Sequence, residues 1–366
     1  MSFPMGMAVI IKPTYACNAS CEYCQVHKLG AFFKPMSKET FSLIEKKLDL
    51  FFKSLSKTKK AKITFYWLGG EPTLMSEDFF ENVYEVTKNS EQNITHKIQT
   101  NLTLFHKKEL KNLKRVLRDF SGESLKSYAI STSIDPVSGA RVLKNQKSYD
   151  KEFFKSLIHI KKEGATYHAV YTVHKDSLHK EKIIYYFFKR LGFSGFNLNA
   201  ICDYESGFRD EKKIGMTPRE YGEFLIRMWD VWERDDFSMY IIPFYSWKLL
   251  RDKKDSSKLR CFNNGRCNST LCAIGPNGDL FTCDRAMQAK QAPLGNILKD
   301  DIKKMFEKKV HVDRVRYLKE NDCAGCKWWE YCKGSCPYES RAEYEGGFGK
   351  SYWCEGYKML FEHIHK

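Results

Sequence analysis

Apolar residues along the first part of the chain fall into two alternating patterns. Short runs rich in β-branched and aromatic residues have the length of strands, and the stretches between them place apolar residues with a helical period. The expected strands span residues 7–12, 62–68, 96–104, 127–134, 167–174 and 196–201. The expected helices span residues 39–55, 78–87, 107–120, 151–163 and 180–191. This succession predicts an α/β fold, a parallel sheet with outer helices that closes as a partial (β/α)6 barrel.

The carboxyl ends of such strands are where ligands are expected. A further helix is predicted from Thr217 to about Asp235, with an apolar stripe that we assign to the core. Beyond Lys258 the character of the chain changes, because nine of its thirteen cysteines lie there. We therefore expect a core domain over residues 1–250 and a small cysteine-rich domain over residues 251–366.

Composition narrows the class of protein. The 366 residues are 42% hydrophobic, and no apolar run approaches the roughly 18 residues that a membrane span needs. The net charge is +16, but the lysines are scattered along helices, which favours a solvated basic face over nucleic-acid binding. An acidic peptide or a flavodoxin-type electron donor remains compatible with this charge. Thirteen cysteines without a secretion signal indicate metal ligation in a reducing, cytoplasmic compartment. The oligomeric state is not predicted.

Three cysteines follow the first expected strand directly. Cys17, Cys21 and Cys24 form a C-x3-C-x2-C array. A [4Fe-4S] cube takes one thiolate per iron, so three cysteines leave one iron open. A zinc knuckle is an alternative, with His27 as fourth ligand. A disulfide framework is another, although it suits shorter, secreted chains.

The array, with the aromatic Tyr23 before its last cysteine, resembles the signature of radical S-adenosylmethionine (SAM) enzymes. The resemblance implies that SAM chelates the open iron and is cleaved by one electron to a 5'-deoxyadenosyl radical. It also implies that Tyr23 lies in the SAM site.

A second cysteine field lies near the carboxyl terminus. Cys323, Cys326, Cys332 and Cys336 are spaced C-x2-C-x5-C-x3-C, and Cys354 follows. With the upstream Cys261, Cys267 and Cys283, the pattern resembles the SPASM domain, an auxiliary-cluster extension of radical SAM enzymes that mature peptides and proteins.

That resemblance implies two further [4Fe-4S] clusters, three in all. The first auxiliary cluster would be held by Cys261, Cys267, Cys283 and Cys336. The second would be held by Cys323, Cys326, Cys332 and Cys354. A double zinc ribbon is the alternative. Cys202 and Cys272 are left over; Cys272 is either a replacement ligand or a plain buried thiol.

Polar strand ends supply the expected SAM-binding residues. Gly69-Gly70-Glu71-Pro72 closes the second strand and resembles the GGEP motif of the superfamily. This resemblance implies that backbone carbonyls and Glu71 accept hydrogen bonds from the SAM ammonium. Asn101 and Ser133 close the next two strands and resemble polar residues that line the SAM site. Arg141 is the nearest basic residue for the SAM carboxylate, or else a solvated loop charge.

The two resemblances together imply a maturase that abstracts hydrogen from a polypeptide side chain. Asp284, directly after Cys283, matches the proposed general base of anaerobic sulfatase-maturating enzymes, or else is a structural carboxylate. Leu68 and Gln25-Val26 depart from the residues of those enzymes. We therefore expect a maturase of ribosomally made peptides, forming a thioether, a carbon–carbon crosslink or another side-chain change, in preference to one that oxidises Cys or Ser to formylglycine.

Two expectations concern partners. The sixteen residues before Cys17 are too few for a leader-binding domain, so we expect the core, the SPASM surface or a separate protein to grip the polypeptide substrate. A flavodoxin- or ferredoxin-type protein is the expected reductant.

Two explanations of another class do not involve catalysis by SAM cleavage. The chain could be a non-catalytic iron–sulfur electron carrier or a zinc-dependent nucleic-acid module.

Overall fold

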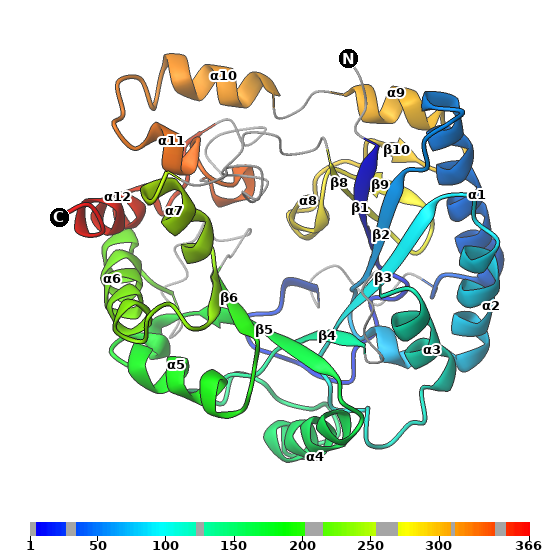
Figure 1. Cartoon of the computed structure of the whole chain (residues 1–366), viewed down its shortest axis with the longest axis horizontal. Helices are drawn as coiled ribbons and strands as arrows, with labels where there is room; N and C mark the ends of the chain where they lie inside the picture. Colours follow the sequence, from blue (N-terminus) through cyan, green and yellow to red (C-terminus); the bar gives the residue numbers. More distant parts are fainter. Residues whose placement is uncertain are drawn as a thin grey trace. The chain divides into compact units, whose positions relative to one another are not determined.

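The computed structural model describes residues 5–26, 34–121, 128–201, 215–253, 270–308, 312–340 and 349–366 (Figure 1). The chain divides into two compact units. The first comprises Met1–Ser133, Arg141–Tyr167 and Asn268–Lys309, and the second comprises Ile134–Ala140, His168–Cys267 and Val310–Lys366. Four of the predicted positions, His27, Cys202, Cys261 and Cys267, lie outside the described residues.

A mostly parallel sheet forms the centre of the first unit. Its strands are β1 (Gly6–Ile11), β2 (Lys62–Trp67), β3 (Asn93–Thr100), β4 (Ala129–Thr132), β8 (Leu271–Ile274), β9 (Asp279–Phe281) and β10 (Gly295–Asn296). They lie in the order β10-β9-β8-β1-β2-β3-β4. The five strands β8, β1, β2, β3 and β4 run parallel, whereas β9 is antiparallel to both of its neighbours, β8 and β10. The described run of β1 alternates between half-buried and buried residues, with Met7, Val9 and Ile11 buried.

Helices cover the outer side of this sheet (Figure 1). They are α1 (Lys38–Leu55), α2 (Glu77–Lys88), α3 (Lys111–Asp119), α4 (Tyr149–Lys162) and α9 (Ile302–Glu307). The unit also contains α8 (Asp284–Gln288), which lies on the inner side of the strands, and the 3-10 helix η2 (Pro72–Leu74). Serine N-caps begin three of the outer helices; the hydroxyl of Ser37, for example, accepts from the Thr40 amide ahead of α1. Their apolar faces pack on the strands through aromatic rings such as Phe41 against Trp67.

The second unit continues the strand–helix alternation. Its parallel strands are β5 (Thr166–Val173), β6 (Gly195–Ala200) and β7 (Tyr240–Ile242). Its helices are η3 (Lys175–Ser177), α5 (Glu181–Arg190), α6 (Pro218–Arg234), α7 (Phe244–Arg251), α10 (Val312–Glu320), α11 (Trp329–Cys332), η5 (Pro337–Glu339) and α12 (Cys354–His363). Helices α6 and α12 pack side by side (Figure 1), where Gly222 and Gly356 allow their backbones to meet.

The predicted elements are present, although several of their boundaries are shifted, most clearly at two places. The third strand ends at Thr100 rather than at 104, because Thr100 and Asn101 turn to bond to Glu71. The helix expected over 107–120 begins at Lys111, because Leu110 adopts a left-handed conformation (φ 50°) directly before it.

The compact units do not follow the expected sequential division at residue 250. Strand β8 pairs with β1, so the segment from 270 to 308 packs with the amino-terminal strands. The predicted apolar stripe of α6 is buried, as expected for core. Across the described ranges, no helix has both the length and the apolar character that crossing a membrane requires.

Candidate active site

The three-cysteine segment turns directly after β1. The Cys24 amide donates to the Cys21 carbonyl at 3.1 Å, and the Ala19 amide donates to Cys17 Sγ at 3.4 Å. Burial raises the pKa of the Cys17 thiol to about 12, and the negative charges of Glu71, Cys21 and Cys24 also raise it.

The strand end that follows β2 packs against the backbone just before Cys17. The Gly70 amide donates to the Thr14 carbonyl at 2.9 Å, and the Glu71 amide donates to the Ala16 carbonyl at 2.8 Å. A Cβ on Gly70 would lie 2.1 Å from the Ala16 oxygen, and one on Gly69, whose φ is +148°, would lie 2.4 Å from the Thr14 oxygen. The two glycines are therefore required by this contact between loops. Their approach to SAM stays a prediction.

Glu71 is the centre of the motif and is fully buried. Its Oε1 accepts from the Thr73 amide (3.0 Å), the Thr73 hydroxyl (2.7 Å) and the Thr100 hydroxyl (2.7 Å). Its Oε2 accepts from the Asn101 amide at 2.7 Å. The carboxylate thus joins the ends of β2 and β3 and the start of η2, which Pro72 begins. Direct contact between Glu71 and SAM stays a prediction, and sequence reasoning missed this structural role.

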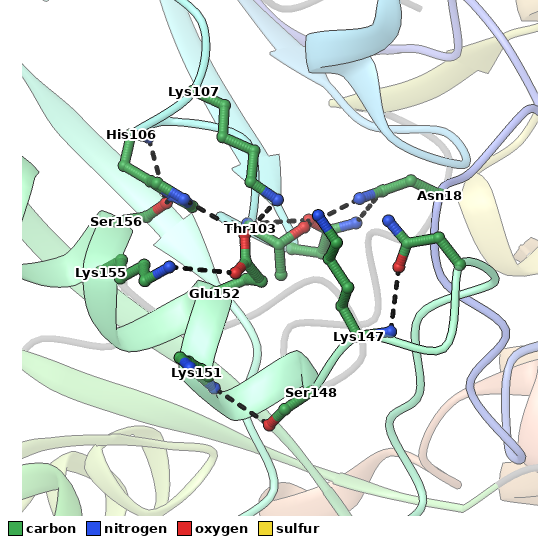
Figure 2. A network of polar contacts seen from close by, with 12 residues as sticks. Asn18, Thr103, His106, Lys107, Lys147, Ser148, Lys151, Glu152, Lys155 and Ser156 are labelled. Atoms are coloured by element: carbon green, nitrogen blue, oxygen red, sulfur yellow. Dashed lines mark hydrogen bonds and ion pairs between the residues drawn. The ribbon is translucent and has the colours of Figure 1, made fainter.

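Asn101 carries the end of β3 to the cysteine segment. Its Nδ2 donates to Asn18 Oδ1 at 2.7 Å and lies 3.8 Å from Cys17 Sγ, while its Oδ1 accepts from Thr103. Asn18 Nδ2 donates in turn to Thr103 Oγ1 at 2.9 Å, a contact visible in Figure 2. Asn101, a candidate SAM-binding residue, is therefore held beside Cys17, a candidate cluster ligand.

The loop after β3 is tied to helix α4 by charge (Figure 2). The buried carboxylate of Glu152 receives the ammonium of Lys107 and lies 3.2 Å from His106 Nε2. His106 Nδ1 also lies 2.8 Å from the hydroxyl of Ser156. Hydrogen bonding to Lys107 is the main cause that lowers the pKa of Glu152 to about 2, so this anchor stays charged at neutral pH.

Arg141 lies beside the cysteine segment. An antiparallel bridge joins Ala19 and Leu143, which brings the segment after Ala140 to the array. The Arg141 Nη1 atom is 3.8 Å from Cys21 Sγ, and its guanidinium lies 5.4 Å from the ring centre of Tyr23. The structure thus brings together Arg141, Tyr23 and the array, as the resemblance implied. Their contact with SAM stays a prediction.

Tyr149, which sequence reasoning missed, links these strand ends. Its buried hydroxyl lies 2.7 Å from the Ser133 carbonyl and 3.2 Å from the Asn101 carbonyl, and it accepts from Arg141 Nη1 at 3.1 Å. As the first residue of α4, it carries no motif that would have identified it. Ser133 itself is buried at the end of β4.

Asp284 begins helix α8, next to the buried Cys283. Its Oδ1 lies 2.5 Å from Lys12 Nζ, and its Oδ2 accepts from Gln288 Nε2 at 2.6 Å. Lys12 follows β1 and is 1% exposed. Sequence reasoning missed Lys12; the Lys-Pro pair at the strand end was the available signal.

Tyr15 lies against the same helix. Its hydroxyl donates to Met287 Sδ at 3.1 Å, and its ring centre is 6.0 Å from Lys12 Nζ. Burial and the charge of Asp284 raise the pKa of this phenol, so it is neutral at physiological pH.

Four cysteines of the second unit line one hollow. They are Cys323, Cys326, Cys332 and Cys354, each partly exposed. These are the four assigned to the second auxiliary cluster, and Cys336 is not among the lining residues. Four thiols around one hollow fit the ligand set of a [4Fe-4S] cube. Within the described ranges, no three His, Cys, Asp or Glu side chains are grouped as for a single metal ion. Cys272 is a fully buried thiol, 3.8 Å from Met7 Sδ.

Two known families match the segments that carry these motifs. The radical SAM superfamily matches residues 11–179, and SPASM, an iron–sulfur cluster-binding domain, matches residues 261–337. The chain is a radical SAM enzyme with a SPASM domain. The two domains confirm [4Fe-4S] clusters and SAM as its cofactors. The zinc and electron-carrier alternatives are thereby excluded.

Curated relatives align with this radical SAM enzyme along nearly its whole length. A cysteine-type anaerobic sulfatase-maturating enzyme of Clostridium perfringens is 23% identical over 98% of this chain and 96% of the relative. A serine-type anaerobic sulfatase-maturating enzyme of Bacteroides thetaiotaomicron is 24% identical over 99% of this chain and 90% of the relative. These relatives favour formylglycine formation over the expected maturation of a ribosomal peptide, so that ranking is corrected.

Solved structures confirm the predicted fold. Native anSMEcpe with bound AdoMet and Cp18Cys peptide has a TM-score of 0.79, is 22% identical, and is matched over 98% of this chain and 96% of the other. Streptococcus suis SuiB bound to precursor peptide SuiA has a TM-score of 0.62 and is 14% identical, over 97% and 76%.

Proposed function

We propose that this radical SAM enzyme oxidises a cysteine or serine side chain of a polypeptide to formylglycine, as an anaerobic sulfatase-maturating enzyme. The full-length likeness to relatives of both the cysteine and the serine type carries the proposal. The structure supports it by placing Asp284 in an ion pair at the end of the first strand.

We assign the cofactors to the residues as follows. Cys17, Cys21 and Cys24 would hold the SAM-binding cluster. The first auxiliary cluster would be bound by Cys261, Cys267, Cys283 and Cys336, and the second by the four cysteines of the hollow. When bound, SAM and the cluster held by Cys17, Cys21 and Cys24 supply the one-electron chemistry that removes a hydrogen atom from a C–H bond.

The neighbouring residues of the chain would orient SAM. Arg141, whose Nη1 lies 3.8 Å from Cys21 Sγ, would bind the carboxylate of SAM, and the carbonyl oxygens around Gly69 and Gly70 would accept from its ammonium. Glu71, Asn101 and Tyr149 would hold these groups in place through their hydrogen bonds between strand ends.

Asp284 would take the proton from the substrate thiol or hydroxyl. Its Oδ1 lies 2.5 Å from the Lys12 ammonium, which holds the carboxylate at the end of the first strand. The remaining carboxylate oxygen is oriented by Gln288. Removal of this proton and of one hydrogen atom from carbon leaves one electron, which an auxiliary cluster would accept, so the substrate loses two hydrogens in total. With serine the product is the aldehyde; with cysteine it is a thioaldehyde, which water converts to the aldehyde and hydrogen sulfide.

The experiment is anaerobic incubation of the cluster-loaded enzyme with SAM, a reductant and matched sulfatase peptides carrying Cys, Ser or Ala at the target. We expect the Ser peptide to lose two hydrogens and the Cys peptide to exchange its CH₂SH group for CHO, in mass spectra. Unchanged Cys and Ser peptides, in a sample that still cleaves SAM, would refute this assignment.

A second function rests on the departures from the relatives. Leu68 and Gln25-Val26 replace residues that face the substrate in the sulfatase-maturating enzymes, and Leu68 is half-buried at the end of β2. Formation of a thioether or carbon–carbon crosslink in a peptide encoded beside the gene would favour this candidate. For either function we propose a flavodoxin- or ferredoxin-type reductant and a reducing cytoplasmic setting.

A further inference from the structure

The hollow lined by four cysteines lies in a surface segment of the second unit. From Cys323 to Lys333 every side chain is at least partly exposed. Between the first two cysteines the chain forms a tight turn, in which the Cys326 amide donates to the Cys323 carbonyl at 3.1 Å. The tip of this turn is Ala324-Gly325, and both residues are exposed.

Small residues at this tip leave the cluster ligands open to close approach. A Cβ on Gly325, whose φ is +68°, would meet no atom within 4 Å. Another protein could therefore bring its own redox centre close to two of the four thiols, with only an alanine and a glycine between. Electron transfer between proteins depends steeply on that separation.

The charges around the hollow indicate what kind of protein would dock. Lys350 and Lys358, both exposed, line the hollow, and among the lining residues that the structure describes Asp322 is the one carboxylate. Beside the turn, the Lys327 ammonium lies 4.8 Å from the ring centre of Trp328 and 3.6 Å from Glu362 Oε1, so its charge is offset and Lys350 and Lys358 are the cations that face the hollow. The whole chain carries a net charge of +16. A cationic rim attracts an acidic surface and steers its approach.

We propose that this rim, formed by Lys350, Lys358 and the Ala324-Gly325 tip, is the docking site for an acidic one-electron carrier protein of the flavodoxin or ferredoxin class. One electron leaves the reduced carrier and enters the four-cysteine cluster, which is reduced by one electron; no bond is made and no proton is transferred. The inference rests on the proposed cluster assignment and reductant, and it extends them by naming the surface.

The test uses the complete, cluster-loaded enzyme and an acidic flavodoxin in its hydroquinone form, mixed by stopped flow. The variant is K350E/K358E, and the matched control is K59E/K60E, which makes the same charge change at exposed lysines of the other unit. We expect the variant to lower the second-order rate about tenfold or more at low ionic strength. Salt should slow the wild type and leave the variant nearly unaffected. The control should match the wild type.

Two further arms make the result decisive. Photoreduced deazaflavin, a small uncharged donor, should reduce the wild type and K350E/K358E equally fast. A324W, which enlarges the tip, should slow transfer from flavodoxin but keep its salt dependence. The proposal is overturned if K350E/K358E behaves as the wild type with flavodoxin, if K59E/K60E is slowed as much, or if deazaflavin reduction is slowed as well.

The docking surface and the proposed function fail separately. Peptide oxidation is assayed with deazaflavin as the sole electron donor, so that no carrier protein is needed. If peptides stay unmodified while flavodoxin transfer depends on the two lysines, the formylglycine assignment falls and the docking surface stands. If peptides are oxidised while transfer ignores the lysines, the reverse holds.

Discussion

The ammonium of Lys12 lies 2.5 Å from Oδ1 of Asp284, in a pair whose lysine side chain is 1% exposed and whose aspartate is 19% exposed. Lys12 follows the first strand, and Asp284 comes directly after Cys283. The pair therefore connects the strand that leads to the three-cysteine array with a segment that carries a candidate ligand of the first auxiliary cluster. A buried ammonium needs such a partner, because an uncompensated charge away from water is costly.

Removing the carboxylate should therefore destabilise the fold. We expect D284A to lower the free energy of unfolding by about 3–5 kcal/mol, because it leaves the Lys12 ammonium buried without its counter-charge. The exposed pair Lys38–Asp78 supplies the control, since D78A should cost about 0–1 kcal/mol. Anaerobic denaturant titration of both variants measures the difference. The double variant K12M/D284L should recover much of the loss, and equal effects of D284A and D78A would contradict this account of the pair.

The sequence predicted the strand–helix order because each strand end carries its own local signal. Asn101 lies beside Glu71 and Cys17, and the amides of Gly70 and Glu71 bond to the backbone just before Cys17, in keeping with their positions after β1, β2 and β3. The role of Glu71 was missed, since a motif names a residue but does not show which donors surround it.

Contacts between segments that are distant along the chain could not be predicted from the sequence. Nothing in the periodicity indicates that β8 pairs with β1, and only that pairing places Asp284 beside Lys12. Tyr149 likewise sits at an ordinary helix start, and its role comes from strand ends some 16 and 48 positions away.

The backbone of Gly70 lies so close to the carbonyl of Ala16 that a methyl group should not fit between them. In G70A the new Cβ would lie 2.1 Å from the Ala16 oxygen, so residues just before Cys17 must move. We expect loss of the first cluster and of SAM binding, measured by iron content and equilibrium dialysis. The control is G139A, whose Cβ would meet nothing within 4 Å and which should bind SAM as the wild type does. Normal SAM affinity in G70A would show that the loop contact is dispensable.

Glu71 should support SAM binding through Asn101. In E71Q the amide group cannot accept at both ends, so either the Thr73 and Thr100 donors or the Asn101 amide loses its partner. We expect SAM affinity to fall about 10- to 100-fold, as for other groups that orient a metal site through its ligands. Isothermal titration under anaerobic conditions measures it. E77Q, at a half-exposed glutamate that accepts from the Asn112 amide, is the matched control and should bind SAM normally.

Replacing a cysteine that binds a cluster should lower the iron content, whereas replacing one that does not should leave it unchanged. We expect replacement of Cys17, Cys21 or Cys24 with Ala to abolish SAM cleavage while about eight of twelve irons remain, since one four-iron cluster is lost. C272A, at a buried thiol with no assigned cluster, should retain all the iron and SAM cleavage. Iron analysis and the yield of 5'-deoxyadenosine measure both properties. SAM cleavage that survives in C17A would refute the assignment of the open iron.

His96 should make stability depend on pH. It is buried on β3, stacks on Trp67 with ring centres 5.7 Å apart, and its Nδ1 accepts from Trp67 Nε1 at 3.0 Å. Burial lowers its pKa from 6.5 to about 3. Between these two pKa values the imidazole of the unfolded chain binds a proton that the folded chain does not bind, so acid favours unfolding. The contribution of this group is complete above pH 6.5 and declines by about 1.4 kcal/mol for each pH unit below it.

Anaerobic denaturant titrations at about pH 7 and pH 5.5 would reveal this dependence, the milder acid being chosen to spare the clusters. H96Q keeps an acceptor for Trp67 but cannot titrate, so its free energy of unfolding should fall by about 1.4 kcal/mol less over that interval than that of the wild type. If H96Q and the wild type lose the same stability on acidification, His96 is protonated in the folded state and the buried neutral imidazole is excluded.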